Sequence, residues 1–168
     1  MPISILTPQP IFKPSIERQR DGFVKVAVTK DMREFADERN RKNFERYHKE
    51  KTVLPESKRQ RKTGYVGETM VKAAFPQLLY TNDIQIDFTH NGLTFDAKSG
   101  GGNTSPNMSH AACNWKDKVE DGIIDYFIFV KVDNGLEMGW VAGIITRQEY
   151  KDKALYVLAG APNRSAYP

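Results

Sequence analysis

Two runs of alternating apolar and polar residues, separated by Asn91-Gly92, occupy residues 83–100. Asn-Gly is the strongest short signal for a two-residue turn, so this segment predicts a β-hairpin. Successive side chains of a strand alternate between faces, which puts the apolar residues on one face of the hairpin. These residues are Ile84, Ile86, Phe88, Leu93, Phe95 and Ala97. The other face carries Asp83, Asp87, Asp96 and Lys98.

The rest of the pattern predicts helices and strands around the hairpin. Strands are expected at residues 22–29, 123–132, 138–145 and 156–158, and helices at 31–51, 64–75 and 105–120. A glycine-rich loop is expected at 99–103, and the capping-box pattern at 146–149 predicts a last short helix. From residue 64 onward this order favours an α/β fold, a mixed sheet with helices on both faces.

The chain divides by composition into a basic N-terminal arm and helix, residues 1–62, and a core, residues 63–168. Residues 17–62 hold 15 Lys and Arg against 9 Asp and Glu, whereas residues 63–168 hold 9 against 12. The basic half suits a polyanionic partner, although a solvated, salt-bridged surface has the same composition. In the predicted helix 31–51, Arg39 and Asn40 break the apolar stripe, which indicates weak docking or contact with a ligand.

Hydropathy and cysteine content indicate which cellular compartment the protein is expected to occupy. The mean hydropathy is −0.58, and no apolar run is long enough to span a bilayer, so we expect no membrane partner. The first residues have no basic start and no long apolar stretch, which argues against a signal peptide. A single cysteine, Cys113, excludes an internal disulfide and fits a reducing, cytoplasmic or otherwise intracellular setting.

The polar face of the hairpin predicts a metal site. With a two-residue turn at Asn91-Gly92, Asp87 lies directly opposite Asp96, and like charges in that position are destabilising without a bound cation. Hard cations such as Mg²⁺ take carboxylate oxygens, and a metal beside an amine is suited to splitting a phosphodiester. A longer turn would bring Asp83 towards Asp96 instead. An ordinary exposed sheet edge is the alternative without a metal.

An acidic residue two positions before a lysine occurs three times, at 56–58, 96–98 and 149–151. Only Asp96 and Lys98 lie on a predicted strand, where this spacing puts both side chains on one face. The other two pairs fall in a basic linker and on the last helix, where solvation explains them. Context therefore singles out the hairpin pair.

A family resemblance rests on three blocks in a fixed order: Gly-x-x-Gly-Glu at 64–68, the hairpin stretch 87–98, and the apolar strand 125–130. Together they resemble the PD-(D/E)xK nuclease superfamily, which has the restriction-endonuclease-like fold. The resemblance covers residues 64–153. No proline precedes Asp87, and the segment before residue 64 has no counterpart in the family pattern.

The resemblance implies a role for each matching residue. Asp87 and Asp96 would ligate Mg²⁺ or Mn²⁺ with help from the Ala97 carbonyl. Lys98 would orient or deprotonate the attacking water, and Glu68 would bind a second metal or a metal-bound water. The implied activity is metal-dependent hydrolysis of DNA, and the expected enzyme is an endonuclease.

Basic residues around this constellation are candidate nucleic-acid contacts, although each could also be a solvated surface residue. They are Lys58, Arg59, Arg61, Lys62, His90 and Lys116. Because many related enzymes dimerise to cut two strands, a homodimer is a further expectation, although no residue argues for one. Two other functions stay open: a catalytically inactive nucleic-acid-binding module of the same fold, and an interaction protein that uses helix 31–51.

Overall fold

The computed structural model describes residues 2–49, 58–106, 119 and 122–153, and all statements about the structure refer to these ranges. Within them the chain forms a mixed α/β fold around a seven-stranded sheet with the order β1-β2-β7-β6-β5-β4-β3. The strands are β1 Ile16–Arg18, β2 Val24–Ala27, β3 Leu79–Tyr80, β4 Phe88–His90, β5 Leu93–Gly101, β6 Tyr126–Val132 and β7 Met138–Thr146. Only β5 and β6 are paired in parallel; the other neighbours are antiparallel.

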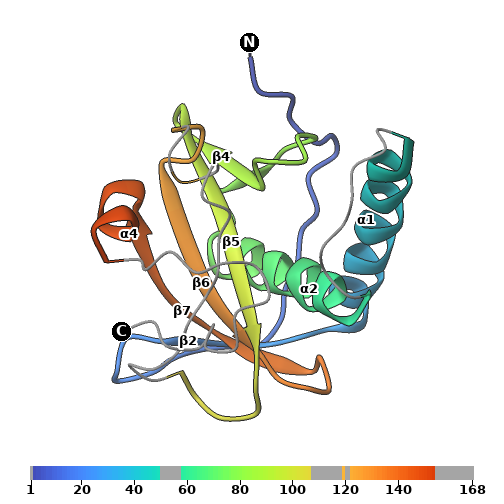
Figure 1. The fold of residues 1–168 in the computed structure, drawn as a ribbon. Coiled ribbons are helices and arrows are strands. Elements are labelled where there is room, and N and C mark those ends of the chain that lie inside the picture. Colours follow the sequence, from blue (N-terminus) through green and yellow to red (C-terminus); the bar gives the residue numbers. More distant parts are fainter. Residues whose placement is uncertain (1, 50–57, 107–118, 120–121, 154–168) are drawn as a thin grey trace, which may run out of the picture.

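Helices cover both faces of the sheet, as Figure 1 shows. Helices α1 (Lys30–Lys49) and α2 (Lys58–Ala74) lie on one side, and α4 (Arg147–Lys153) lies on the other. Alternation along β6 explains this layering: Ile128 and Val130 belong to the large core under α1 and α2, whereas Phe127 packs against Tyr150 of α4. We find no helix in the described ranges with the length and apolar character that a bilayer crossing requires.

The predicted hairpin turn is confirmed. His90 pairs with Leu93 across Asn91 and Gly92, whose φ angles of 49° and 78° are those of a two-residue hairpin turn. The first arm is shorter than expected, because β4 begins only at Phe88 and residues 83–87 form a loop. The expectation that the apolar residues of the hairpin share one face is therefore wrong. Phe88 joins the large core, while Ile86 joins the smaller core beneath α4.

Two other element boundaries differ from expectation. The glycine-rich segment after the hairpin is not a loop, because β5 continues through Ser99 to Gly101 and pairs with Val130–Val132 of β6. Helix α2 begins at Lys58 rather than at residue 64, so the predicted basic cluster lies on its first turns. The predicted strand 22–29, the strand 138–145, the helix 31–51 and the capped last helix all have counterparts in β2, β7, α1 and α4.

The N-terminal segment contributes to the same sheet as the hairpin. Strand β2 pairs with β7, from Val24 opposite Val141 to Ala27 opposite Met138, and β1 extends the edge beyond it. Helix α1 then packs on α2 and buries Met32 and Ala36 in the large core. Residues 1–62, expected as an arm and a helix, therefore also supply two strands. The predicted helix 105–120 and strand 156–158 fall almost entirely outside the described residues.

Candidate active site

The candidate site lies where β4 separates from β5. Strand β4 pairs with β5 only from Phe88 to His90, whereas β5 runs on to Gly101. Asp87 stands at the start of this divergence, and its Oδ2 accepts a hydrogen bond of 2.8 Å from the Ala97 backbone N–H. The carboxylate thus binds the edge of β5 just beyond the last paired residue. The contact involves the Ala97 N–H, whereas the sequence had suggested a role for the Ala97 carbonyl.

Asp96 and Lys98 are brought together on β5, as the spacing of two predicts. Asp96 is 1% exposed, and the Lys98 Nζ lies 2.8 Å from its Oδ2. The Lys98 side chain keeps 21% of its surface exposed, whereas that of Asp96 keeps 2%. Asp87 immediately precedes Phe88, and Asp96 immediately follows its partner Phe95, so the turn register brings both acids to the point where the two strands diverge.

Asp83, the alternative to Asp87, has a different environment. It is exposed in the loop before β4, and its Oδ1 accepts a hydrogen bond of 2.7 Å from the Gln85 N–H. This contact closes a local turn of the kind that aspartate side chains commonly make. The structure therefore gives Asp83 a local role in the loop and places Asp87 next to Asp96.

Helix α2 brings Glu68 to the same region because Gly67 permits a close approach to β5. A Cβ at Gly67 would lie 1.9 Å from the Ser99 Oγ, whereas a Cβ at Gly64 would meet nothing within 4 Å. Of the two glycines in the Gly-x-x-Gly-Glu pattern, only the second, Gly67, is therefore needed for packing. Glu68 follows it directly and is 7% exposed.

The three acids act on one another electrostatically. Burial and the charge of Asp87 raise the pKa of Glu68 to about 8, with a smaller contribution from Asp96, and these effects outweigh the opposing attraction of Arg39. Carboxyl groups that disfavour each other's ionisation are a feature of catalytic sites and of ion-pair networks alike. The site therefore favours the protonated form of Glu68, with the positive charges of Arg39 and Lys98 close to the acids.

Arg39 of α1 is the residue that the sequence did not assign to the site. Its Nε lies 3.1 Å from the Glu68 Oε2, and its Nη2 donates to the Thr81 carbonyl at 3.2 Å. The guanidinium also stacks over the Tyr80 ring, 4.8 Å from the centroid. Burial lowers the pKa of Arg39, but the neighbouring acids, Glu68 first, raise it above its ordinary value. The break that Arg39 makes in the apolar stripe of α1 was the available signal.

The predicted nucleic-acid contacts do not share one environment. Lys58 and Arg59 are exposed on the first turn of α2, while Arg61 stacks on Phe44 and Lys62 pairs with Asp37 at 3.2 Å. On α1, the exposed Arg41 is held by Glu38 and Glu45, which is typical of a salt-bridged helix surface. The half-buried His90 lies beside Asn91 at the hairpin turn, and Lys116 lies outside the described residues.

The carboxylates of the site meet part of what a divalent metal ion requires of its ligands. Among the described residues, no three His, Cys, Asp or Glu side chains form a group that could hold a metal ion. Mg²⁺, however, is commonly bound by one or two carboxylates, with waters and substrate phosphate oxygens completing its shell. Asp96, and Asp87 bound to the N–H of the residue that follows Asp96, are two carboxylates and fit that smaller requirement. Glu68 is turned towards Arg39 and does not add a third ligand in this arrangement.

Comparison with known proteins adds no relative. Neither the family models, nor the curated proteins, nor the solved structures contain a match to this chain.

Proposed function

We propose that this protein is a metal-dependent nuclease that hydrolyses DNA phosphodiester bonds. The observation that carries the proposal is the joint position of Asp87, Asp96 and Lys98 where β4 and β5 diverge. An acid pair across a hairpin, with an amine 2.8 Å from one of the acids, is the arrangement that the PD-(D/E)xK pattern requires. The order of α2, the β4–β5 hairpin and the parallel strand β6 supports a restriction-endonuclease-like core.

The reaction adds water across a phosphorus–oxygen bond, so a site must hold the water, the phosphate and a proton acceptor. A Mg²⁺ or Mn²⁺ ion held by Asp87 and Asp96 would act as the Lewis acid that activates the water. Lys98 would orient the attacking water and offset the charge that develops on the phosphoryl oxygens. The ion pair with Asp96 fixes the direction of the Lys98 side chain, which is partly exposed.

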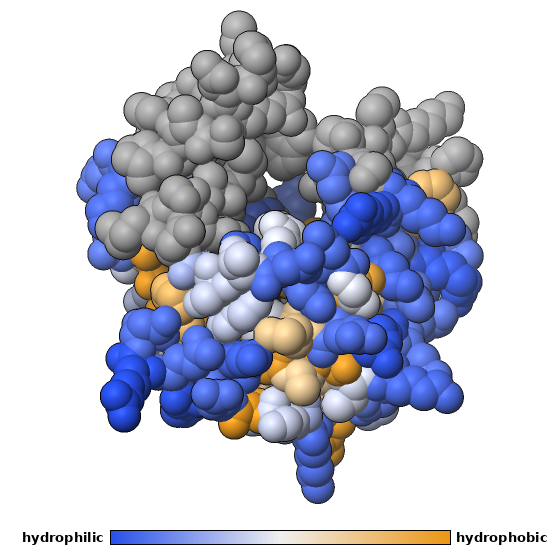
Figure 2. All heavy atoms as spheres, turned by 90° about the horizontal axis from the view of Figure 1, so that it is seen from below, coloured by the Kyte–Doolittle hydropathy of each residue, from blue (hydrophilic) through white to orange (hydrophobic). Residues whose placement is uncertain are grey.

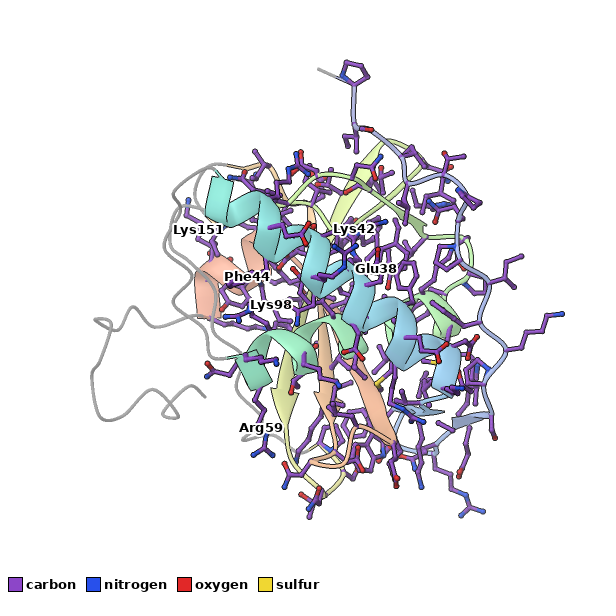
Figure 3. The ribbon with its side chains drawn as sticks, turned by 90° about the vertical axis from the view of Figure 1, so that its right-hand side faces the viewer. Glu38, Lys42, Phe44, Arg59, Lys98 and Lys151 are labelled. Carbon is purple, nitrogen blue, oxygen red and sulfur yellow. The ribbon has the colours of Figure 1, made fainter. Side chains whose placement is uncertain are left out.

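Basic side chains near the start of α2 offer contacts for the DNA backbone. A shallow hollow of about 180 Å³ lies between this helix end, the end of β5 and the β6–β7 turn, and Arg59, Lys62 and Asn134 are among its lining residues. The side of the molecule that carries this turn is predominantly hydrophilic (Figure 2), and Arg59 projects from the lower side of α2 in Figure 3. Phosphate contacts need such charge and no sequence-specific geometry.

The test is cleavage of plasmid DNA by the purified full chain in the presence of Mg²⁺ or Mn²⁺. We expect Asp96→Asn and Lys98→Met to lower the cleavage rate by at least about a hundredfold. The matched controls are Asp152→Asn and Lys151→Met, because both residues are exposed on α4 and Lys151 belongs to the other acid-x-lysine pair in the described core. The control variants should cut as the wild type does.

The same experiment distinguishes a nuclease from a DNA-binding module without catalytic activity. If the wild-type chain retards DNA at low salt but never cuts it with either metal, it is a binding module without catalysis. If it neither binds nor cuts DNA at low salt, where phosphate contacts are strongest, the nuclease proposal and the binding alternative both fail.

A further inference from the structure

Arg39 places a permanent positive charge inside the acid cluster of the candidate site. Its side chain is 10% exposed, and it comes from α1, which lies outside the segment that carries the family resemblance. Three contacts fix the guanidinium: the Glu68 carboxylate, the Thr81 carbonyl and the Tyr80 ring. A guanidinium does not lose its proton in a protein, so this charge is present at every working pH.

The ion pair with Arg39 divides the acids of the site into two groups. Glu68 directs its Oε2 at the Arg39 Nε, with only 9% of its side chain exposed, whereas Asp87 binds the N–H of Ala97, the residue that follows Asp96 on β5. This division accounts for the finding that no three potential ligands converge among the described residues. A second dication beside Glu68 would have to approach the buried guanidinium, where repulsion between cations is weakly screened.

We propose that Arg39 takes the place of a second metal ion, so that the site binds one divalent cation per chain, at Asp87 and Asp96. The inference rests on the proposed function, since it concerns the metal of that same site. Arg39 acts as a positioning residue: its contact with the Glu68 carboxyl group holds that group away from the ion. Glu68 is then not a metal ligand, in contrast to the role that the family resemblance implies for it.

The experiment counts Mn²⁺ ions bound to the full chain without DNA, by calorimetry and by the electron paramagnetic resonance signal of free Mn²⁺. We expect one ion per wild-type chain. Asp87→Asn and Asp96→Asn should weaken its binding by at least about tenfold, while Glu68→Gln should change it by less than about threefold. Glutamine can still accept a hydrogen bond from Arg39, so this variant keeps the packing of the site.

Removal of the Arg39 guanidinium should allow a second metal ion to bind beside Glu68. Arg39→Met leaves Glu68 without its partner, and we expect this variant to bind two ions per chain. Arg39→Met/Glu68→Gln should return to one, and Arg39→Lys, which keeps a positive charge, should stay at one. Arg41→Met is the matched control, because Arg41 lies on the same helix but is exposed and paired with Glu38 and Glu45. The control should bind one ion.

The results distinguish this inference from the proposed function. Two ions on the wild type, or a Glu68→Gln variant that binds Mn²⁺ at least about tenfold more weakly, would overturn the role of Arg39 and leave a metal-dependent nuclease in place. A folded Arg39→Met variant that still binds one ion would also overturn it. If Arg39→Met does not fold, the wild-type count and Glu68→Gln decide the question. A wild-type chain that binds no Mn²⁺, with or without DNA, would refute both.

Discussion

At the scale of single residues, the candidate site depends on one close contact between a helix and a strand. Gly67 lets α2 approach Ser99 of β5 so closely that no side chain fits between them. The next residue along the helix, Glu68, is thereby carried to the edge of β5 near Asp87 and Asp96. A side chain at position 67 would push α2 outward and with it the Arg39–Glu68 pair.

This contact predicts opposite effects for the two glycines of α2. Gly67→Ala should lower the free energy of unfolding by about 1–3 kcal/mol, because the new methyl group would overlap Ser99. Gly64→Ala is the matched control in the same helix; it meets nothing within 4 Å and should gain about 1 kcal/mol from helix propensity. Urea unfolding followed by circular dichroism measures both changes. Equal effects of the two substitutions would contradict the packing argument.

A second-site variant tests the cause of the overlap. The buried Ser99 Oγ has no hydrogen-bond partner among the described residues, so Ser99→Ala removes the clashing atom without breaking a hydrogen bond of the described core. Gly67→Ala combined with Ser99→Ala should therefore be more stable than Gly67→Ala alone. Failure of this partial rescue would point to another source of strain in α2.

At the scale of elements, local turn and capping chemistry was predictable, whereas pairing between distant segments was not. Asn91-Gly92 and the 146–149 capping pattern act within a few residues, and both appear as expected. The glycines at 100–101 indicated a loop, but pairing with β6 keeps them in a strand. The partnership of Arg39 with Glu68 joins two helices, and no local pattern of residue types specifies it.

The capping box that opens α4 makes a prediction of its own. The Thr146 N–H donates to the Glu149 Oε2 at 2.8 Å, and the Glu149 N–H donates back to the Thr146 Oγ1 at 3.1 Å. Thr146→Ala should cost about 1 kcal/mol in unfolding free energy, because a helix N–H loses its acceptor. Thr63→Ala, within α2, is a threonine control that should not destabilise, since alanine has the higher helix propensity.

The capping box also makes the stability of the protein depend on pH. Hydrogen bonds from the Thr146 backbone and side chain lower the pKa of Glu149. The ionised form is thus favoured by folding, and its contribution to stability is present above the ordinary glutamate pKa and is lost as the pH falls through the lowered value. Nuclear magnetic resonance titration should show the Glu149 pKa rising only part of the way towards its ordinary value in Thr146→Ala, because the backbone N–H of residue 146, the larger cause, remains. An unchanged pKa would mean that the box does not form in solution.

At the scale of the whole molecule, the buried acid of the site affects global stability. The pKa of Glu68 is about 8 in the folded chain, against an ordinary value of 4.5, chiefly because burial disfavours its ionised form. The folded protein therefore retains a proton that the unfolded chain releases. Without divalent ions, stability should fall as the pH rises from about 4.5 towards about 8 and should level off above that value.

Glu68→Gln isolates this effect, because glutamine does not titrate. Unfolding free energies measured in urea from about pH 5 to about pH 9 should decline for the wild type and decline less for the variant. The comparison concerns the slope with pH, since the substitution also shifts the stability of the variant by an amount that does not depend on pH. Identical slopes would show that Glu68 is ionised throughout this range in the folded chain.

The sheet also dictates when the chain can complete its fold. Val24 of β2 pairs with Val141 of β7, so the second and the last of the described strands along the chain are hydrogen-bonded neighbours. Such contacts between remote positions form slowly, because a long stretch of chain must first be brought into a loop. On the ribosome, β2 must wait with its apolar side uncovered until β7 emerges. A nascent chain that stalls before residue 138 is then a candidate for chaperone capture.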